Sequence, residues 1–226
     1  MKKLLLLPFL LLTAHAADPE GDYGWVNLLE NDSLELWQNG SAGSREKHPE
    51  AGPQWSIKDG VLKLDKSAEG RGGHIITKEH GYFSFELKFE FIISEGGNSG
   101  VKYRVNDESI GLEYQVYDDA GTEKNKVACL YALKGADEDK KKVNAPGTEW
   151  NTARILAVGN TLQHWINGEL VMEIEVGSDE WKAAFAKSKY KDVKDFAANP
   201  GPIHLQDHGS DVMYRNIMLR KVMDTE

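Results

Sequence analysis

Apolar and polar residues alternate along many short stretches of this chain, and turn-forming residues separate the stretches. The longest stretch runs from Tyr82 to Phe91, and large apolar residues occupy every second position in it: Phe83, Phe85, Leu87, Phe89 and Phe91. Successive side chains of a β-strand point to opposite faces, so this period of two predicts a strand with one face in a core. Each of these side chains contributes about 1.5–3 kcal/mol on burial, which predicts that a second sheet packs over that face.

Three dipeptides predict tight hairpins between such strands. Asp59-Gly60, Gly159-Asn160 and Asn167-Gly168 each join two alternating stretches. These residue types tolerate the positive φ angles that two-residue turns require. With about a dozen strands in all, the pattern predicts an all-β protein, and a two-sheet antiparallel jelly-roll sandwich suits that number better than a small barrel.

One stretch has the period of a helix instead. It predicts a short helix over residues 179–190, capped by Ser178 or Asp179. The apolar face of this helix would consist of Trp181, Ala184, Phe185 and Ser188. Two polar segments, residues 41–54 and 134–148, are expected to be solvated loops, the second with a mobile surface stretch at residues 137–142.

Residues 1–16 have the pattern of a cleavable secretory signal. Two lysines precede an apolar run over residues 4–12, and Ala14-His-Ala16 supplies a cleavage site after Ala16. The apolar run is shorter than the roughly 20 residues that a membrane-spanning helix needs. We therefore expect an exported protein, periplasmic or secreted, whose residues 17–226 form one domain.

Charge and cysteine content narrow the classes of function. The chain has a net charge of −9, and without the two lysines of the signal it has 25 basic and 36 acidic residues, a net charge of −11. Binding of nucleic acid depends on Lys and Arg, so nucleic acid is excluded as a partner. The single cysteine, Cys129, cannot form an intramolecular disulfide and lies in an apolar run, so we interpret it as a core residue.

Three of the predicted strands carry polar residues on one face. The strands over residues 98–105 and 111–117 follow each other closely and are expected to pair, and a third begins at Ile203. If all three share a sheet, one surface gathers Asn98, Lys102, Arg104, Glu113, Gln115, Tyr117, Gln206 and His208. A surface of this kind suits a polar ligand. We interpret His204 as a surface residue and leave it out of the site.

These residue types can support proton transfer and charge stabilisation. Glu113 or His208 can move a proton, and Arg104 or Lys102 can stabilise an oxyanion. An alternative stays open, because Glu113 and Arg104 can also form an ordinary cross-strand ion pair on an exposed sheet. On an extended strand His204 and His208 would be about 13 Å apart, which argues against a two-histidine metal site.

Seven ordered motifs resemble the 3-keto-disaccharide hydrolase domain family, whose members are also described as 3-keto-glucoside 1,2-lyases and 3-keto-2-hydroxy-glucal hydratases. The motifs run from about residue 24 to residue 222 and are Trp55-Ser-Ile-Lys-Asp-Gly60, Asn98-Ser-Gly-Val101 with Arg104, Gly111-Leu-Glu-Tyr-Gln115, Glu149-Trp-Asn151, Ile166-Asn-Gly168, Gly201-Pro-Ile-His-Leu-Gln-Asp-His-Gly209 and Tyr214-Arg-Asn-Ile217. The resemblance implies a concanavalin A-like jelly roll in an exported bacterial protein. His204 and the 134–148 loop depart from the family's pattern, so substrate preference transfers least.

The resemblance also implies a reaction, namely cleavage of the glycosidic bond of 3-keto-glucosides. A ketone at C3 acidifies the hydrogen on C2, so a base can remove that proton and the C1 substituent can leave. Glu113 would be the base, Arg104 and Lys102 would hold the keto oxygen, and His208 would be the acid. Asn98, Gln115 and Gln206 would orient hydroxyl groups. The reaction needs no cofactor on this scheme, although a divalent cation held by Glu113 and His208 is an alternative.

A sugar 3-oxidoreductase would be the functional partner that supplies the substrate. Two rival functions remain open. The first is a carbohydrate-binding module without catalysis, in which Tyr117 or Trp150 stacks on sugars. The second is a retaining glucanase, which needs two carboxylates about 5–5.5 Å apart. The strand positions beside Glu113 hold Gly111, Gln115 and Tyr117 instead of acids, which disfavours the glucanase.

Overall fold

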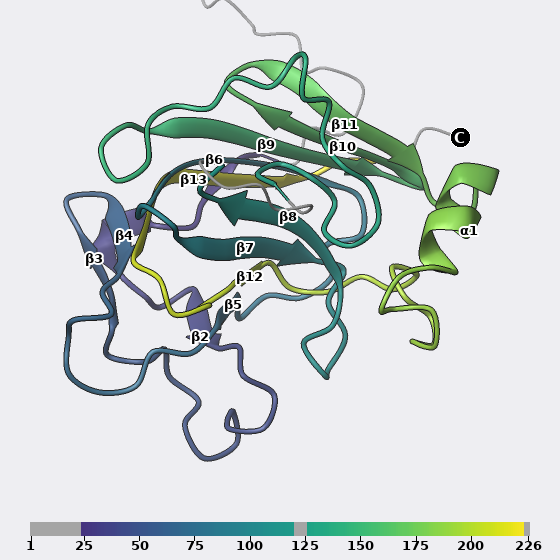
Figure 1. Cartoon of the computed structure of the whole chain (residues 1–226). Helices are drawn as coiled ribbons and strands as arrows, with labels where there is room; N and C mark the ends of the chain where they lie inside the picture. The colour runs from purple at the N-terminus through teal and green to yellow at the C-terminus, as the bar shows by residue number, and fades with distance from the viewer. Residues whose placement is uncertain (1–23, 120–125, 224–226) are drawn as a thin grey trace, which may run out of the picture.

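The protein is a sandwich of two antiparallel sheets, seen in a computed structural model that describes residues 24–119 and 126–223 (Figure 1). The elements are β1 (Val26–Asn27), a 3-10 turn (Glu30–Asp32), β2 (Trp37–Asn39), β3 (Trp55–Lys58), β4 (Val61–Leu64), β5 (Ile75–Thr77), β6 (Phe85–Ile93), β7 (Asn98–Tyr103), β8 (Leu112–Tyr117), β9 (Asn151–Val158), β10 (Thr161–Ile166), β11 (Glu169–Glu175), α1 (Asp179–Phe185), β12 (His204–Leu205) and β13 (Val212–Lys221).

The larger sheet has the order β11-β10-β9-β6-β13-β4-β3, with β1 paired to β13. The smaller sheet has the order β2-β5-β12-β7-β8. This arrangement confirms the predicted all-β fold with one short helix. It also places β12 directly beside β7, so the three strands with polar faces are neighbours, although β12 lies about 100 residues further along the chain than β7.

The predicted hairpins are confirmed. Asp59-Gly60 joins β3 to β4, Gly159-Asn160 joins β9 to β10, and Asn167-Gly168 joins β10 to β11. Asp59 and Asn167 have φ angles of 52° and 47°, in the region that aspartate and asparagine tolerate better than most residues. The turns therefore fix the register of five of the strands in the larger sheet.

The core lies between the sheets. Phe85, Leu87, Phe89 and Phe91 of β6 are buried, as their alternation predicts, whereas Phe83 precedes the strand. Two buried hydrogen bonds connect the layers: the Ser99 hydroxyl contacts the Tyr214 hydroxyl at 2.9 Å, and the Tyr103 hydroxyl contacts His164 Nε2 at 2.9 Å. Burial lowers the pKa of His164 to about 3, so its imidazole is neutral in this contact.

The helix begins where the sequence predicts but ends earlier. The Ser178 hydroxyl accepts a hydrogen bond from the Trp181 amide, which confirms the cap, and the helix ends at Phe185 instead of near residue 190. Beyond it the chain folds back, so that Trp181, Phe185 and Phe196 stack on one another with ring centroids 5.6–6.3 Å apart. Figure 1 shows α1 and the segment that follows it at one end of the sandwich, so these aromatic residues belong to that end.

The expectation of a surface stretch at residues 137–142 holds except at one residue. Glu138, Asp139, Lys140 and Lys142 are exposed, whereas the Lys141 side chain is only 4% exposed and forms ion pairs with Asp119 and Glu138. The proposed signal at residues 1–16 lies outside the described residues. Within the described part of the chain, no helix has the length and apolar character needed to cross a bilayer.

Candidate functional site

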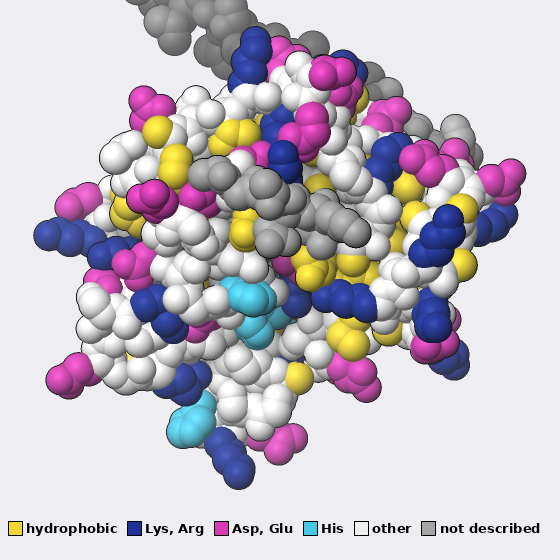
Figure 2. Space-filling model, viewed as in Figure 1, with side chains coloured by type: hydrophobic (Ala, Val, Ile, Leu, Met, Phe, Trp, Pro, Cys, Tyr) yellow, Lys and Arg dark blue, Asp and Glu magenta, His cyan; other side chains and the backbone are white. Residues whose placement is uncertain are grey.

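The predicted polar residues meet on the outer face of the smaller sheet. Cross-strand pairing sets them in rows: His204 lies opposite Lys102, and Lys102 lies opposite Glu113. In the next row the Gln206 amide bonds to the Gly100 carbonyl, and Gly100 lies opposite Gln115. Neighbouring strands are about 4.8 Å apart, so each row brings its side chains within reach of one ligand. Figure 2 shows histidine and basic side chains gathered over this sheet.

Gly100 leaves a notch in the middle of this face. A Cβ atom on Gly100 would overlap Oε1 of Glu113, so the Glu113 carboxylate leans across β7 into the space that the glycine leaves open. The two glutamine side chains flank the same position from β8 and from the end of β12. The sequence motif Asn98-Ser-Gly-Val101 therefore has a physical role, because a larger residue at position 100 would displace the carboxylate.

Glu113 is a buried carboxylate that forms no ion pair with the described residues. It is 4% exposed, and no side chain in the described part of the chain hydrogen-bonds to it. Burial raises the pKa of Glu113, an effect that the positive charges of Lys102, Lys189 and His208 oppose. A carboxylate in this state is a stronger base than an exposed one, and a raised pKa of this kind is common in acid-base catalysis.

Glu86 shows the contrasting case on the other sheet. It is 3% exposed, and its carboxylate accepts hydrogen bonds from Arg154 at 2.6 Å and from Arg220 at 2.8 and 3.0 Å. Burial would raise the pKa of Glu86, but the two arginines leave it lowered. Two differences therefore separate the two carboxylates: Glu113 is more deeply buried than Glu86, and among the described residues no arginine pairs with it.

Lys102 lies beside Glu113 on the neighbouring strand. Its side chain is half-buried, and its ammonium group donates to the Ser109 carbonyl at 3.4 Å. Burial lowers the pKa of Lys102; Glu113 opposes this change and Lys189 adds to it. Lys189, which the sequence analysis missed, lies over the Tyr131 ring at 4.3 Å. Its position follows α1 in the chain, so only the tertiary fold brings its charge to this face.

The amide residues occupy the expected positions. Gln115 donates to the Asn98 side chain at 2.9 Å, and Asn98 pairs across the strands with Tyr117. His208 is exposed and lies beyond β12, in the turn that leads to β13. Its charge still acts on Glu113, so the two residues that the sequence analysis selected for proton transfer belong to one electrostatic environment.

The structure places the Arg104 side chain away from the polar face. Its φ angle of 50° ends β7, so its side chain no longer follows Lys102 onto the polar face. The guanidinium donates to the carbonyls of Phe83 and Gly159, at 2.8 and 2.6 Å from one nitrogen, and lies 3.8 Å over the Phe83 ring. This placement does not favour Arg104 as the group that holds a keto oxygen, and no ion pair between Arg104 and Glu113 occurs among the described residues.

The interpretation of His204 as a surface residue is wrong. It is fully buried, on the same face as Lys102, and its ring lies 4.8 Å from the ring of His74. Burial lowers the pKa of His204 well below its usual value, helped by the charges of Lys102, His74 and Arg45. His74 accepts a hydrogen bond from the Asp207 amide at 3.0 Å. No local pattern marks His74, because it precedes a three-residue strand.

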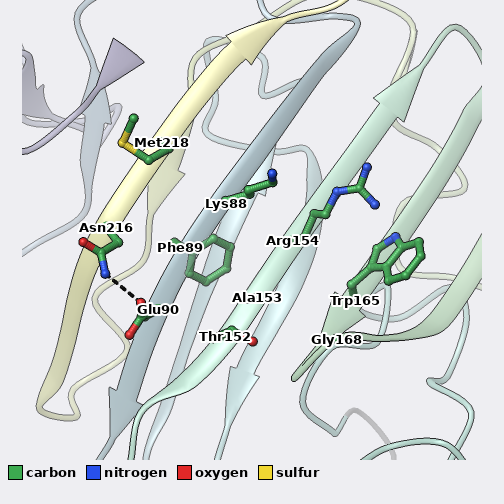
Figure 3. Close-up of a pocket in the computed structure, with 10 residues that line it drawn as sticks. All are labelled: Lys88, Phe89, Glu90, Thr152, Ala153, Arg154, Trp165, Gly168, Asn216 and Met218. Atoms are coloured by element: carbon green, nitrogen blue, oxygen red, sulfur yellow. Dashed lines mark hydrogen bonds between the residues drawn. The ribbon is translucent and has the colours of Figure 1, made fainter. Parts of the chain in front are cut away.

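A hollow of about 390 Å³ lies on the opposite side of the sandwich, on the outer face of the larger sheet (Figure 3). Its walls include Lys88, Arg154 and Trp165. Its carboxylate, Glu90, is already bonded to Arg215 at 2.7 Å and to Asn216 at 2.6 Å. Because Glu90 is already paired, this hollow offers space for a ligand but no carboxylate comparable to Glu113.

The described residues contain no group of three His, Cys, Asp or Glu side chains placed to hold a metal ion. Cys129 is buried, as predicted, and burial raises the pKa of its thiol to about 12. A thiol in this state is protonated at neutral pH and is a poor nucleophile. The side chains of Glu113 and Lys102 on the polar face can transfer protons and form hydrogen bonds.

Fold and site together define a jelly-roll sandwich with a polar face on one outer sheet surface. Within that class the chain can be placed further. Residues 24–220 match the family of 3-keto-alpha-glucoside-1,2-lyase-like domains, and the chain belongs to this family. The match covers nearly the same range as the motifs from which the sequence analysis inferred a resemblance.

Individual relatives are similar over most of the chain. A protein of Bacteroides thetaiotaomicron named 3-keto-disaccharide hydrolase is 29% identical over 240 residues, which cover 89% of this chain and 79% of that protein. Two crystal structures from Parabacteroides distasonis, provisionally described as glycosyl hydrolases, are also similar. One has a TM-score of 0.73 and 25% identity, covering 88% of this chain and 94% of the other. The second has a TM-score of 0.66 and 29% identity, covering 88% and 100%.

Proposed function

We propose that this protein is an exported carbohydrate-active enzyme that cleaves the glycosidic bond of glucosides carrying a ketone at C3. Membership of the family and the names of the relatives support this substrate class. The observation that carries the proposal is the buried carboxylate of Glu113, which has no ion pair among the described residues, with the ammonium group of Lys102 on the adjacent strand. A base beside a cation is the pair that enolate formation requires.

The reaction follows from that pair. Glu113 removes the proton from C2, and the electrons of the C–H bond form an enolate whose oxygen at C3 is stabilised by Lys102. The enolate then collapses: the C3 ketone is restored, a double bond forms between C1 and C2, and the substituent oxygen leaves C1. That oxygen takes up a proton, from His208 or from the protonated Glu113. Addition of water across the new double bond completes a net hydrolysis.

The remaining polar residues have supporting roles in this proposal. Asn98, Gln115 and Gln206 orient hydroxyl groups of the sugar, and Tyr117 lies at the edge of the same face. Arg104 has no part in the reaction, because its guanidinium is committed to backbone carbonyls. The oxyanion role falls to Lys102 alone. An enzyme that oxidises the C3 hydroxyl of glucosides must supply the substrate.

The proposal is tested with 3-keto-trehalose, an α-linked disaccharide with one oxidised ring. We expect the purified protein to release glucose from it and to leave trehalose intact. Glu113→Gln should reduce turnover by about 100-fold or more, the usual contribution of a general base. Because burial raises the pKa of Glu113, activity should fall on the acid side at a higher pH than an ordinary glutamate would give.

Glu86→Gln is the matched control, since it removes the other buried carboxylate, on the opposite sheet. Its folded fraction should retain wild-type turnover. Near-normal activity of Glu113→Gln would eliminate Glu113 as the base. Binding of the 3-keto sugar without glucose release would favour a carbohydrate-binding module, and cleavage of an unoxidised β-glucan would favour a glucanase.

A further inference from the structure

The floor of the polar face holds buried polar atoms that lack partners. In the described part of the chain, no hydrogen bond reaches Oε1 of Gln115, Oε1 of Gln206 or either ring nitrogen of His204. These residues are 2%, 9% and 0% exposed. A buried polar atom without a partner destabilises the folded state, so four such atoms together are unusual in a folded protein.

Their positions converge on one place. Gln206 and Gln115 lie on either side of Gly100, and His204 precedes Gln206 by two residues on the same face. The backbones that carry the two glutamines are about 10 Å apart, two strand spacings, with only a glycine between them. The two side chains therefore flank the Glu113 carboxylate, which leans into the notch at Gly100, and a ligand that contacts this carboxylate would be within reach of both.

We propose that His204, Gln206 and Gln115 form a subsite that binds hydroxyl groups of the sugar ring. This inference rests on the proposed function for the kind of ligand, and it adds His204 to the residues that touch it. A neutral imidazole offers one donor and one acceptor, and the two amide oxygens accept. Hydroxyl groups both donate and accept, so a pair of them satisfies this set.

The surrounding charges favour an uncharged ligand at this position. Lys102 stands between His204 and Glu113, and Arg45 and His74 also act on His204. A cation would meet the positive charges of Lys102 and Arg45, and an anion would meet the Glu113 carboxylate and two amide oxygens that cannot donate. A polyhydroxylated ring avoids both costs. The same reasoning explains why the protein retains buried atoms that destabilise its free state.

The experiment measures binding of methyl α-glucopyranoside, which lacks the ketone and is not consumed, by titration calorimetry. We expect Gln206→Leu and His204→Phe each to weaken binding by about tenfold, the effect of one to two lost hydrogen bonds. The melting temperature should stay unchanged or rise, because each change removes an unpartnered buried group. A purely structural role would lower both quantities together.

Gln38→Leu is the matched control. Gln38 lies on the same face of the same sheet, opposite Ile76 on β5, and away from the notch. Its binding should equal that of the unaltered protein. The inference is overturned if the two site variants bind as well as Gln38→Leu, if they lose stability along with affinity, or if the unaltered protein does not bind the glucoside. None of these results depends on turnover, so failure to cleave 3-keto-trehalose would count against the proposed reaction alone.

Discussion

Glu113 and Glu86 show how the partners of a residue decide its role. Both are glutamates on strands, both are almost fully buried, and each faces away from the shared core. Glu86 meets two arginines and has a lowered pKa, whereas Glu113 meets no arginine and has a raised one. The ionised carboxylate of Glu86 stabilises the folded protein, whereas the ionised carboxylate of Glu113 destabilises it.

This contrast predicts opposite effects of pH on two variants. Because the pKa of Glu113 is raised in the folded state, its carboxyl ionises at a lower pH in the unfolded chain than in the folded protein. The free energy of unfolding therefore falls as pH rises above about 4.5. Glu113→Gln should therefore stabilise the protein at pH 7, by about 1.4 kcal/mol for each unit by which the pKa is raised. The gain should vanish below pH 4. Urea unfolding across this range measures it.

Glu86→Gln should behave in the opposite sense. A lowered pKa contributes stability above the unfolded value and loses it as pH falls, so this variant should be less stable than the unaltered protein at pH 7 and similar to it in acid. If Glu113→Gln instead destabilises the protein at neutral pH, Glu113 has a stabilising partner, and its role as a free base is in doubt.

At the scale of elements, the segment that begins at Lys126 supports β8, the strand that carries Glu113. The amides of Ala128 and Tyr131 bond to the carbonyls of Gln115 and Glu113 at 2.9 and 3.0 Å. This contact extends the smaller sheet beyond β8 without forming a regular strand. Lys141 holds the segment in place through Asp119, whose other oxygen accepts from the Val127 amide at 2.8 Å.

We expect Lys141→Ala to loosen this segment. Loss of the buried ammonium group leaves Asp119 without its main partner, which should lower the free energy of unfolding by about 3 kcal/mol. Hydrogen exchange of the Ala128 and Tyr131 amides should speed up more than exchange in the larger sheet. Lys140→Ala is the control, because Lys140 is 61% exposed and pairs only with Asp137 among the described residues. Equal protection in both variants would refute this role of Lys141.

At the scale of the whole molecule, Arg104 connects the two sheets. It follows β7 of the smaller sheet, and its guanidinium binds carbonyls at Phe83, just before β6, and at Gly159, in the β9–β10 turn. A further contact reaches the Ala197 carbonyl at 3.5 Å. One side chain therefore joins the end of one sheet to two strands of the other and to the loop after the helix.

Replacing Arg104 by Lys should destabilise the sandwich while sparing the chemistry. A lysine cannot reproduce the planar set of donors, and the carbonyls left behind should cost about 2–4 kcal/mol of unfolding free energy. Turnover of the remaining folded protein should stay within about threefold of wild type. A variant of normal stability with strongly reduced turnover would restore Arg104 to the reaction.

Local patterns determined much of this protein. The period-two alternation of β6, the three turn dipeptides and the Ser178 cap are each fixed by interactions between residues close in sequence, so they could be predicted. The faces of β7 and β8 followed for the same reason. Apart from Arg104, the polar residues of both strands were therefore correctly placed on one side of the sheet.

Only the tertiary structure decided how those residues act. The pairing of β12 with β7 brought His204 to the site, a positive φ angle turned Arg104 away from it, and chain reversal after α1 brought Lys189 near. Each of these depends on contacts between distant segments. Burial and charge pairing are sums over such contacts, which is why Glu86 and Glu113 look alike in the sequence and differ in the folded protein.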